Sequence, residues 1–243
     1  MRLWDNSTGW LADFTTDFSF ITKAVSNVMP VDGPTFFIAP FGSKMPNNST
    51  GGAFGLLSSD SALNGTYYQI VAVEFDTFAN DWDPSSDHVG IYVNSIVSKA
   101  NVTWNSSISN GSTANTWISY NSTTKILSVF LTYVENPVFS GNSSLSYSVD
   151  LSTVLSEWVS VGLSTATGQA AETHTIRSWW FNSTLELVDG VPHTNNTRTG
   201  ANVNTKNWNM ENKLGLIIGL VVSFGGVSCE LGLLWFHLLE KRG

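Results

Sequence analysis

The sequence predicts an all-β sandwich or barrel followed by a single C-terminal transmembrane helix. Between residues 13 and 188, short apolar segments alternate with clusters of Gly, Asn, Ser and Pro, which is typical of strands joined by turns. This region shows no strong 3.6-residue periodicity, so long helices are not expected in it. Residues 214–239 are apolar at all but four positions, and this stretch is long enough for a helix to cross a bilayer.

The expected strands follow one another along the first part of the chain. In the first strand, Phe14, Phe18 and Phe20 alternate with polar residues, as in a strand with one buried face. The later strands are expected at residues 35–39, 69–75, 89–93, 116–120, 126–133, 145–149, 158–164 and 178–186. Together they predict one β-rich domain of about 200 residues.

The composition of the chain changes after residue 188. Residues 189–213 are rich in Asn and Thr and poor in apolar side chains, which predicts a flexible stalk. Residues 214–239 are expected to span the membrane, with Lys241 and Arg242 in a short cytoplasmic end at 240–243. The alternative, a buried C-terminal helix of the globular domain, is disfavoured by the polar stalk before it. We therefore expect a single-pass type I protein of the plasma membrane with its β domain outside the cell.

Glycosylation sequons favour the same compartment. Asn-X-Ser/Thr sequons begin at Asn6, Asn47, Asn48, Asn64, Asn101, Asn105, Asn110, Asn121, Asn142, Asn182 and Asn195. This density is typical of a glycosylated extracellular surface, although an Asn- and Ser-rich composition also produces sequons by chance. The single cysteine, Cys229, cannot form a disulfide within the chain. The N-terminus lacks the apolar region of a signal peptide, so we expect the chain to be incomplete at its start.

The few charged residues of the chain are unevenly distributed. The net charge is −8 and no cluster of Lys and Arg is present, so nucleic acid is not expected as a partner. Several acids fall instead in VEFDTFANDWDPSSDHVGIYVN, residues 73–94. Glu74 and Asp76 lie two apart and share one face of a strand, and the following loop can fold Asp83 and His88 back toward them. Oxygen ligands suit Ca²⁺, whereas a set that includes imidazole suits Mn²⁺ or Zn²⁺.

A glycanase active site and a solvated acidic loop are the two alternative interpretations of these acids. A β-sandwich glycanase would carry a third acid after Glu74 and Asp76, but Phe78 or Ala79 stands there, and neither can act as acid or nucleophile. No enzymatic activity is therefore expected. A solvated acidic loop is the plainer alternative, but it does not explain why acids interrupt an otherwise apolar strand.

At these residues the sequence strongly resembles the legume, or L-type, lectin family. The pattern E-x-D-x-F-x-N-x-x-D-P-x(3)-H is followed by V-G-I-x-V-N-S-I without a gap. The segments DGPTFFIAP, GGAFGL, VGLSTATG and ETHTIRSWWF match in the family's order. The resemblance implies a lectin domain over residues 1–188, folded as a jelly-roll sandwich of antiparallel sheets and lacking the family's N-terminal strand.

The resemblance implies two metal ions as cofactors. A transition metal such as Mn²⁺ would be bound by Glu74, Asp76, Asp83 and His88. Ca²⁺ would be bound by Asp76, the Phe78 carbonyl, Asn80 and Asp83. Ser98 stands where the family holds a metal-bound water, and Asp81 and Asp87 match no ligand position.

The resemblance also implies a carbohydrate site beside the metals. It would be formed by Asp32, Gly52, Phe78 and Asn80. Asp32, after a peptide bond that is cis in the family, would accept bonds from two sugar hydroxyls, and the N–H of Gly52, or in its place Gly51, would donate. Asn80 would donate its amide hydrogens, and Phe78 would stack on the apolar sugar face. Taken alone, Asp32-Gly33 is a plain turn. The loop at 168–172, on which sugar choice depends, leaves the hexose open.

The expected function is metal-dependent carbohydrate binding by a membrane-anchored lectin domain. The stalk and membrane segment look like those of plant lectin-domain receptor-like kinases, but no kinase motif is present, so a receptor truncated before its kinase is expected. The alternative is a receptor-like or decoy module that binds a non-sugar ligand or a partner receptor, with structural metals only. A homodimer is a further expected partner state.

Overall fold

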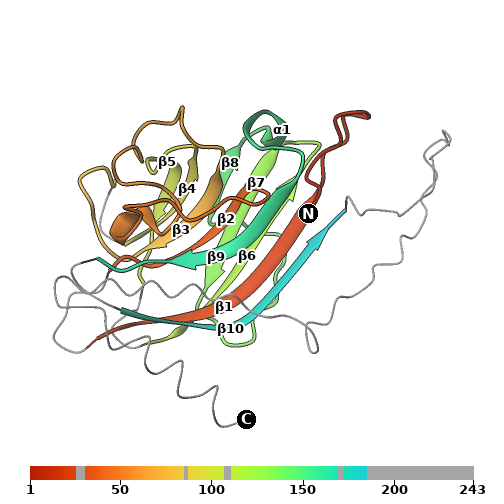
Figure 1. Ribbon diagram of the computed structural model, residues 1–243. Coiled ribbons are helices and arrows are strands. Elements are labelled where there is room, and N and C mark those ends of the chain that lie inside the picture. Colours follow the sequence, from red (N-terminus) through yellow and green to blue (C-terminus); the bar gives the residue numbers. More distant parts are fainter. Residues whose placement is uncertain (26–30, 85–86, 107–110, 169–171, 185–243) are drawn as a thin grey trace, which may run out of the picture.

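Two five-stranded antiparallel sheets pack face to face in this protein (Figure 1). The structure, a computed structural model, describes residues 1–25, 31–84, 87–106, 111–168 and 172–184. The first sheet, here called the back sheet, has the strand order β10-β1-β6-β7-β8. Its strands are β1 (Phe14–Ala24), β6 (Thr113–Asn121), β7 (Ile126–Thr132), β8 (Leu145–Ser148) and β10 (Glu172–Ser183).

The second sheet, the front sheet, has the strand order β5-β4-β3-β2-β9. Its strands are β2 (Pro34–Pro40), β3 (Val71–Asp76), β4 (His88–Val93), β5 (Ser98–Thr103) and β9 (Val159–Thr165). The chain passes between the sheets after β1, β5, β8 and β9, so both sheets combine distant parts of the sequence. Two short helices, η1 (Gly51–Ala53) and α1 (Leu151–Val154), lie in the connections.

Aromatic side chains join the two sheets. Along β1 the buried residues alternate with partly exposed ones, and Phe18 and Phe20 point inward. Their rings meet the ring of Phe75 on β3 at centroid distances of 5.8 and 5.2 Å. Burying an aromatic ring stabilises a fold by about 1.5–3 kcal/mol, so this contact across the sandwich is a main part of the core.

β3 is buried on both of its faces. Val71, Val73 and Phe75 point into the core between the sheets. Ala72 instead packs in a second apolar cluster with Phe54 and other residues of the loops that cover the front sheet. Because side chains alternate along a strand, Glu74 and Asp76 share the loop-covered face with Ala72. The strand thus places two carboxylates beneath the loops rather than in the main core.

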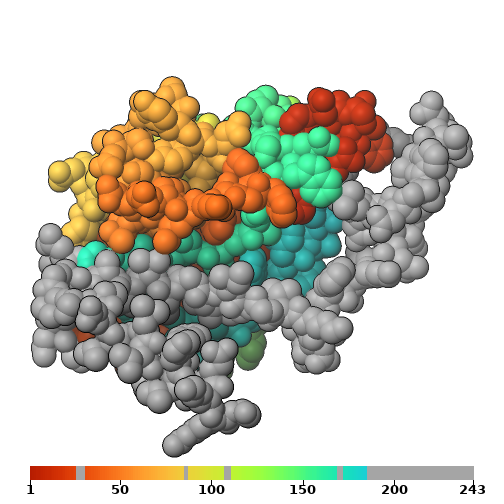
Figure 2. Space-filling view, in the orientation of Figure 1, coloured from red at the N-terminus to blue at the C-terminus, as the bar shows by residue number. Residues whose placement is uncertain are grey.

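The N-terminal residues pack against the far end of the sandwich. The backbone N–H of Leu3 donates to the Glu157 carbonyl at 2.7 Å, and the N–H of Val159 donates to the Met1 carbonyl at 3.0 Å. The Arg2 side chain forms an ion pair with the Glu157 carboxylate. Figure 2 shows these first residues, in red, lying against the green segment around α1. This segment therefore belongs to the folded domain.

The predicted sandwich of antiparallel strands is confirmed, and each predicted strand has a counterpart. β5 was not predicted because Ser98, Lys99 and Asn101 are polar, and only Ala100 and Val102 pack against the core. β10 begins at Glu172, whereas the sequence predicted a start at residue 178. The first half of β10 was not predicted because its residues are mostly polar, as in β5.

The predicted membrane segment lies beyond the part of the chain that the structure describes. Residues 189–213, 214–239 and 240–243, predicted as stalk, transmembrane helix and cytoplasmic end, all fall outside it. Within the described ranges, no helix has the length and apolar character needed to cross a bilayer.

Candidate functional site

The loop-covered face of the front sheet gathers three metal-ligating side chains. Glu74 and Asp76 on β3 and His88 on β4 are at most 1% exposed. The register pairs Asp76 with His88 and Glu74 with Gly90. One ligand atom from each of the three residues lies within 4.8 Å of the others. The pairing of β3 with β4 thus brings together three of the six predicted metal ligands.

A glycine makes room for the group. A methyl carbon on Gly90 would lie 2.2 Å from the Ser98 hydroxyl and 2.3 Å from Oε1 of Glu74. Glu74 therefore reaches across β4 to Ser98 on β5, which donates a hydrogen bond to its Oε1. His88 Nε2 lies 3.3 Å from the same oxygen. The position predicted to hold a metal-bound water, Ser98, thus contacts the metal-ligating cluster.

The loop after β3 carries the remaining predicted ligands. Two acidic side chains accept hydrogen bonds from the backbone of this loop. The Phe78 N–H donates to Asp76 Oδ1 at 2.7 Å, and the Asn80 N–H donates to Asp83 Oδ2 at 2.6 Å. Asp83 is thus held within the loop by Asn80, and it is not among the three residues whose ligand atoms lie together. Asp81 is exposed. The carboxylate of Asp87 accepts a hydrogen bond from Ser106, away from the cluster.

The electrostatics of the cluster favour a bound cation. Burial, followed by the charge of Glu74, raises the pKa of Asp76 to about 10. Burial also raises the pKa of Asp83 to about 6. Glu74 Oε2 and Asn80 Oδ1 are buried without a hydrogen-bond partner. Buried polar atoms are rarely left without a partner, and these carboxylates would ionise readily beside a cation. The donor set of carboxylate, amide and imidazole groups therefore fits the predicted ions.

Asp32 lies two residues before β2, after a cis peptide bond from Val31. The side chain of Asp32 is 3% exposed, and its Oδ2 is buried without a hydrogen-bond partner. Methyl carbons on Gly51 and Gly168 would lie 3.7 and 3.9 Å from this oxygen. Burial, the charge of Glu172 and then that of Asp83 raise the pKa of Asp32 to about 7. A buried carboxylate oxygen in a cradle of glycines is suited to accept bonds from a ligand's hydroxyls.

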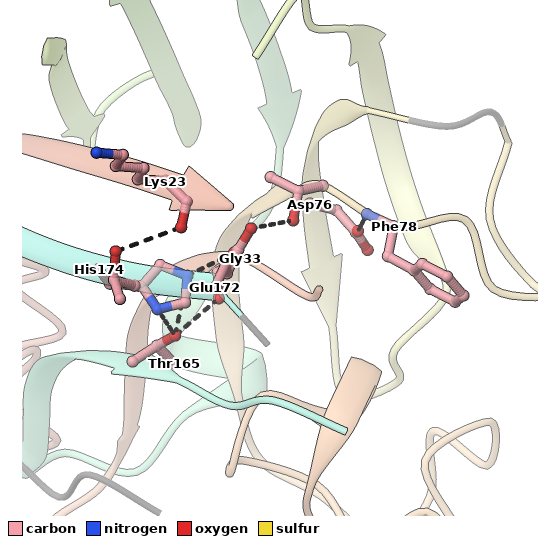
Figure 3. A network of polar contacts seen from close by, with 9 residues as sticks. Lys23, Gly33, Asp76, Phe78, Thr165, Glu172 and His174 are labelled. Atoms are coloured by element: carbon pink, nitrogen blue, oxygen red, sulfur yellow. Dashed lines mark hydrogen bonds and ion pairs between the residues drawn. The ribbon is translucent and has the colours of Figure 1, made fainter. Parts of the chain in front are cut away.

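The η1 turn brings the other predicted sugar contacts beside Asp32. A methyl carbon on Gly52 would lie 2.4 Å from Asn80 Oδ1, so the bare backbone of Gly52 lets the amide pack on the turn. Gly51, with φ of +65°, precedes it. Phe78 is half-buried, and its ring points away from the polar residues around Asp76 (Figure 3). Gly52 and Asn80 thus lie together near Asp32 at one end of the front sheet, whereas Phe78 lies two residues before Asn80 in the loop after β3.

A polar network that the sequence did not single out supports this end of the sheet (Figure 3). Thr77 donates its hydroxyl to Glu172 Oε2 at 3.1 Å, and its N–H donates to the Asp32 carbonyl at 3.1 Å. Glu172 Oε1 lies 2.5 Å from His174 Nε2. The Thr165 hydroxyl lies 2.8 Å from His174 Nδ1 and 3.1 Å from the Gly33 carbonyl, to which it donates. The only signal in the sequence was the alternation of Glu172 and His174 within ETHTIRSWWF.

Comparison with known proteins places this geometry in a family. The legume lectin domain model matches residues 1–197. Agglutinin-2 of Cladrastis kentukea is 51% identical over 187 residues, which cover 76% of this chain and 63% of that protein. A mannose/glucose-specific lectin of Centrolobium tomentosum is 45% identical over 190 residues, covering 76% and 74%. The chain therefore spans less than two thirds of Agglutinin-2.

Solved structures agree with this assignment. Lectin I-B4 of Griffonia simplicifolia, in its metal-free form, superposes with a TM-score of 0.68 at 41% identity, covering 76% of this chain and 77% of that one. Lectin UEA-II in complex with galactose gives a TM-score of 0.67 at 43% identity, covering 76% and 78%. These relatives are lectins and not enzymes, so the prediction of a non-enzymatic protein is confirmed. From its sequence match and its fold, the chain belongs to the legume lectin family.

Proposed function

We propose that this chain binds carbohydrate at Asp32, Gly52, Phe78 and Asn80. The observation that carries the proposal is the Asp32 carboxylate. Its Oδ2 is buried without a hydrogen-bond partner, and Gly51 and Gly168 lie beside it. Holding such an oxygen away from water costs free energy unless a ligand pairs with it. The names of several relatives, among them a mannose/glucose-specific lectin, support the same ligand class.

The binding is proposed to depend on two metal ions. A transition metal such as Mn²⁺ would be held by Glu74, Asp76, Asp83 and His88. Ca²⁺ would be held by Asp76, the Phe78 carbonyl, Asn80 and Asp83. The ions would supply the positive charge that keeps these buried carboxylates ionised. The loop that they order carries both Phe78 and Asn80, so this chain's own contacts to the sugar depend on its shape.

A glycan array probed with the purified full chain tests the proposal. Binding to at least one array glycan should disappear in EDTA and return after Ca²⁺ and Mn²⁺ are added. Asp32→Asn should abolish binding while leaving the stoichiometry of bound metal unchanged. Asp60→Asn, at an exposed surface position, serves as the matched control. If the folded, metal-loaded protein binds no glycan, the proposal is wrong.

A non-sugar ligand is the second candidate. Peanut lectin, which superposes with a TM-score of 0.67 at 39% identity over 77% of this chain and 78% of that one, has been solved with a nine-residue peptide. A receptor-like or decoy module of this kind would use its metals only to hold the fold. Asp32→Asn would then leave ligand binding intact, whereas Asp83→Ala would remove it together with the metal.

We further propose that residues 214–239 anchor the domain in the plasma membrane as a single-pass type I, receptor-like protein. The apolar length of that segment and the basic residues after it support this proposal. The full chain should stay in the membrane pellet at alkaline pH, and a chain ending at residue 213 should not. Release of both into the supernatant would contradict the proposal.

A further inference from the structure

The outer face of the back sheet carries a row of three aromatic residues and one aspartate across four neighbouring strands. The register places Trp180 opposite Asp17, Asp17 opposite Trp117, and Trp117 opposite Phe130. The adjacent row is polar throughout, and it consists of Asn182, Thr15, Ser119, Ser128 and Ser146. The aromatic side chains of this face are therefore concentrated beside a polar row.

Two residues at the end of β10 point toward that face. Trp179 and Phe181 turn inward, because Trp179 donates its ring N–H to the Thr16 hydroxyl at 2.9 Å and Phe181 stacks on Phe14 at 5.8 Å. Trp180 and Asn182 alternate with them and must turn outward. They lie two residues apart, roughly 7 Å along the strand. The side chain of Trp180 is 41% exposed.

Asn182 also begins the sequon Asn182-Ser183-Thr184. We propose that Asn182 carries an N-linked glycan whose first sugar packs on the exposed indole of Trp180 beside the carboxylate of Asp17. The first sugar of such a glycan is N-acetylglucosamine, which has an apolar face of C–H groups suited to an indole ring. Its hydroxyl and acetamido N–H groups are donors for a carboxylate.

Asp17 is suited to receive such donors. Its side chain is partly exposed, and it forms no ion pair within the described ranges. It stands between the exposed Trp180 ring on one side and Trp117 on the other, and the Trp117 ring is itself stacked on Phe139 at 5.6 Å. A sugar above Trp180 would therefore find an apolar floor and a polar acceptor together.

Other sequons of the domain lack this setting. Three sequons in the described ranges lie on strands, at Asn101, Asn121 and Asn182. Two positions before them, on the same strand face, stand Lys99, Ser119 and Trp180 respectively. Asn121 is also on the outer face of the back sheet, but its side-chain oxygen already accepts bonds from Thr124. Asn101, whose side chain is exposed on β5 two residues after Lys99, is therefore the control for Asn182.

The glycan would lie far from the carbohydrate site. β10 is the last strand of the back sheet and has no neighbour on its outer side among the described strands (Figure 1). Ten residues separate Asn182 from Glu172, roughly 33 Å along β10, so the glycan would leave the carbohydrate site open.

The experiment begins with glycan occupancy. The full chain is expressed in glycosylating yeast behind a cleavable signal and purified, and peptides are mapped after enzymatic release of N-glycans in heavy-oxygen water. Asn182 should be occupied. Asn182→Gln should then lower Tm by about 2–4 °C, whereas Asn101→Gln should change it by less than about 1 °C. Trimming each glycan to one N-acetylglucosamine should keep the Tm of the untrimmed protein.

Substitutions of Trp180 test whether the Asn182 glycan packs on the indole ring or is only attached to the chain. In a Trp180→Thr background, Asn182→Gln should no longer lower Tm, and in a Trp180→Tyr background part of the effect should remain. The proposal is overturned if Asn182 is unoccupied, whether or not other sequons carry glycans. It is also overturned if Tm is the same with and without the Asn182 glycan, or if the loss persists in the Trp180→Thr background.

Discussion

Thr77 donates its hydroxyl to the carboxylate of Glu172, 95 residues further along the chain, at 3.1 Å. The same Thr77 donates its backbone N–H to the Asp32 carbonyl. One residue of the loop after β3 therefore contacts both the start of β10 and Asp32, the proposed sugar acceptor.

Thr77→Val should weaken sugar binding about 5- to 15-fold, because the carboxylate of Glu172, whose charge acts on Asp32, loses a buried donor, while the backbone N–H that reaches Asp32 is kept. Isothermal titration with the array's best sugar, in saturating Ca²⁺ and Mn²⁺, measures the change. Thr175→Val, at an exposed position of β10, should leave the affinity unchanged. Equal losses in the two variants would contradict this role.

Gly90→Ala should disrupt the metal cluster, because its methyl carbon would stand 2.3 Å from Glu74 Oε1. We expect at least a tenfold loss of Mn²⁺ affinity together with a lower Tm. Gly65→Ala is the control, since its methyl carbon would meet nothing closer than 3.7 Å. Unchanged Mn²⁺ binding in Gly90→Ala would show that the ion does not depend on this position of Glu74.

Asp83→Asn should weaken binding of both ions by tenfold or more, because one charged oxygen is lost at a position predicted to bridge them. Asp81→Asn should have no such effect, since Asp81 is exposed in the same loop. Metal content by mass spectrometry after dialysis gives a direct comparison. Loss of metal from Asp81→Asn alone would reverse the assignment.

Metal removal should change the sign of the pH dependence of stability. In the ion-free protein, burial raises the pKa of Asp32 to about 7 and of Asp83 to about 6, from an ordinary 3.8. Between pH 4 and 7 the folded chain therefore holds protons that the unfolded chain releases, so the free energy of unfolding should fall as pH rises. With Ca²⁺ and Mn²⁺ bound, ions replace these protons and stability should rise over the same interval.

Urea unfolding at several pH values, with EDTA or with both ions, measures this difference. The Asp32→Asn variant should show a smaller fall in EDTA than the unmodified chain, because one raised carboxyl is gone. A free energy of unfolding that rises with pH in EDTA would contradict the prediction.

The sequence predicted the fold where apolar periodicity was strong. β1 and β3 were visible because burial on one or both faces leaves a clear pattern of Phe and Val residues. β5 was not visible, because its inward face carries only Ala100 and Val102 as apolar residues and begins with Ser98. The pattern records burial and not hydrogen bonding, so strands paired mainly through their backbone escape it.

The candidate site was predictable for a different reason. Glu74, Asp76 and His88 fall in a short stretch, and acids within an apolar strand are conspicuous. Glu172 and His174 lie far along the chain, and only the pairing of β10 with β1 and the path of β9 bring them to Thr77 and Thr165. Contacts of this separation depend on the topology, which spacing alone does not contain.

The two-sided burial of β3 gives the site an experimental reporter. A strand with neighbours on both edges and cover on both faces exchanges its amide hydrogens only when the whole domain opens. Hydrogen–deuterium exchange at Ala72, Val73 and Glu74 should therefore report global stability. Ions held at the end of the strand should slow this exchange in proportion to how tightly they bind, so their affinity becomes measurable even without a known sugar.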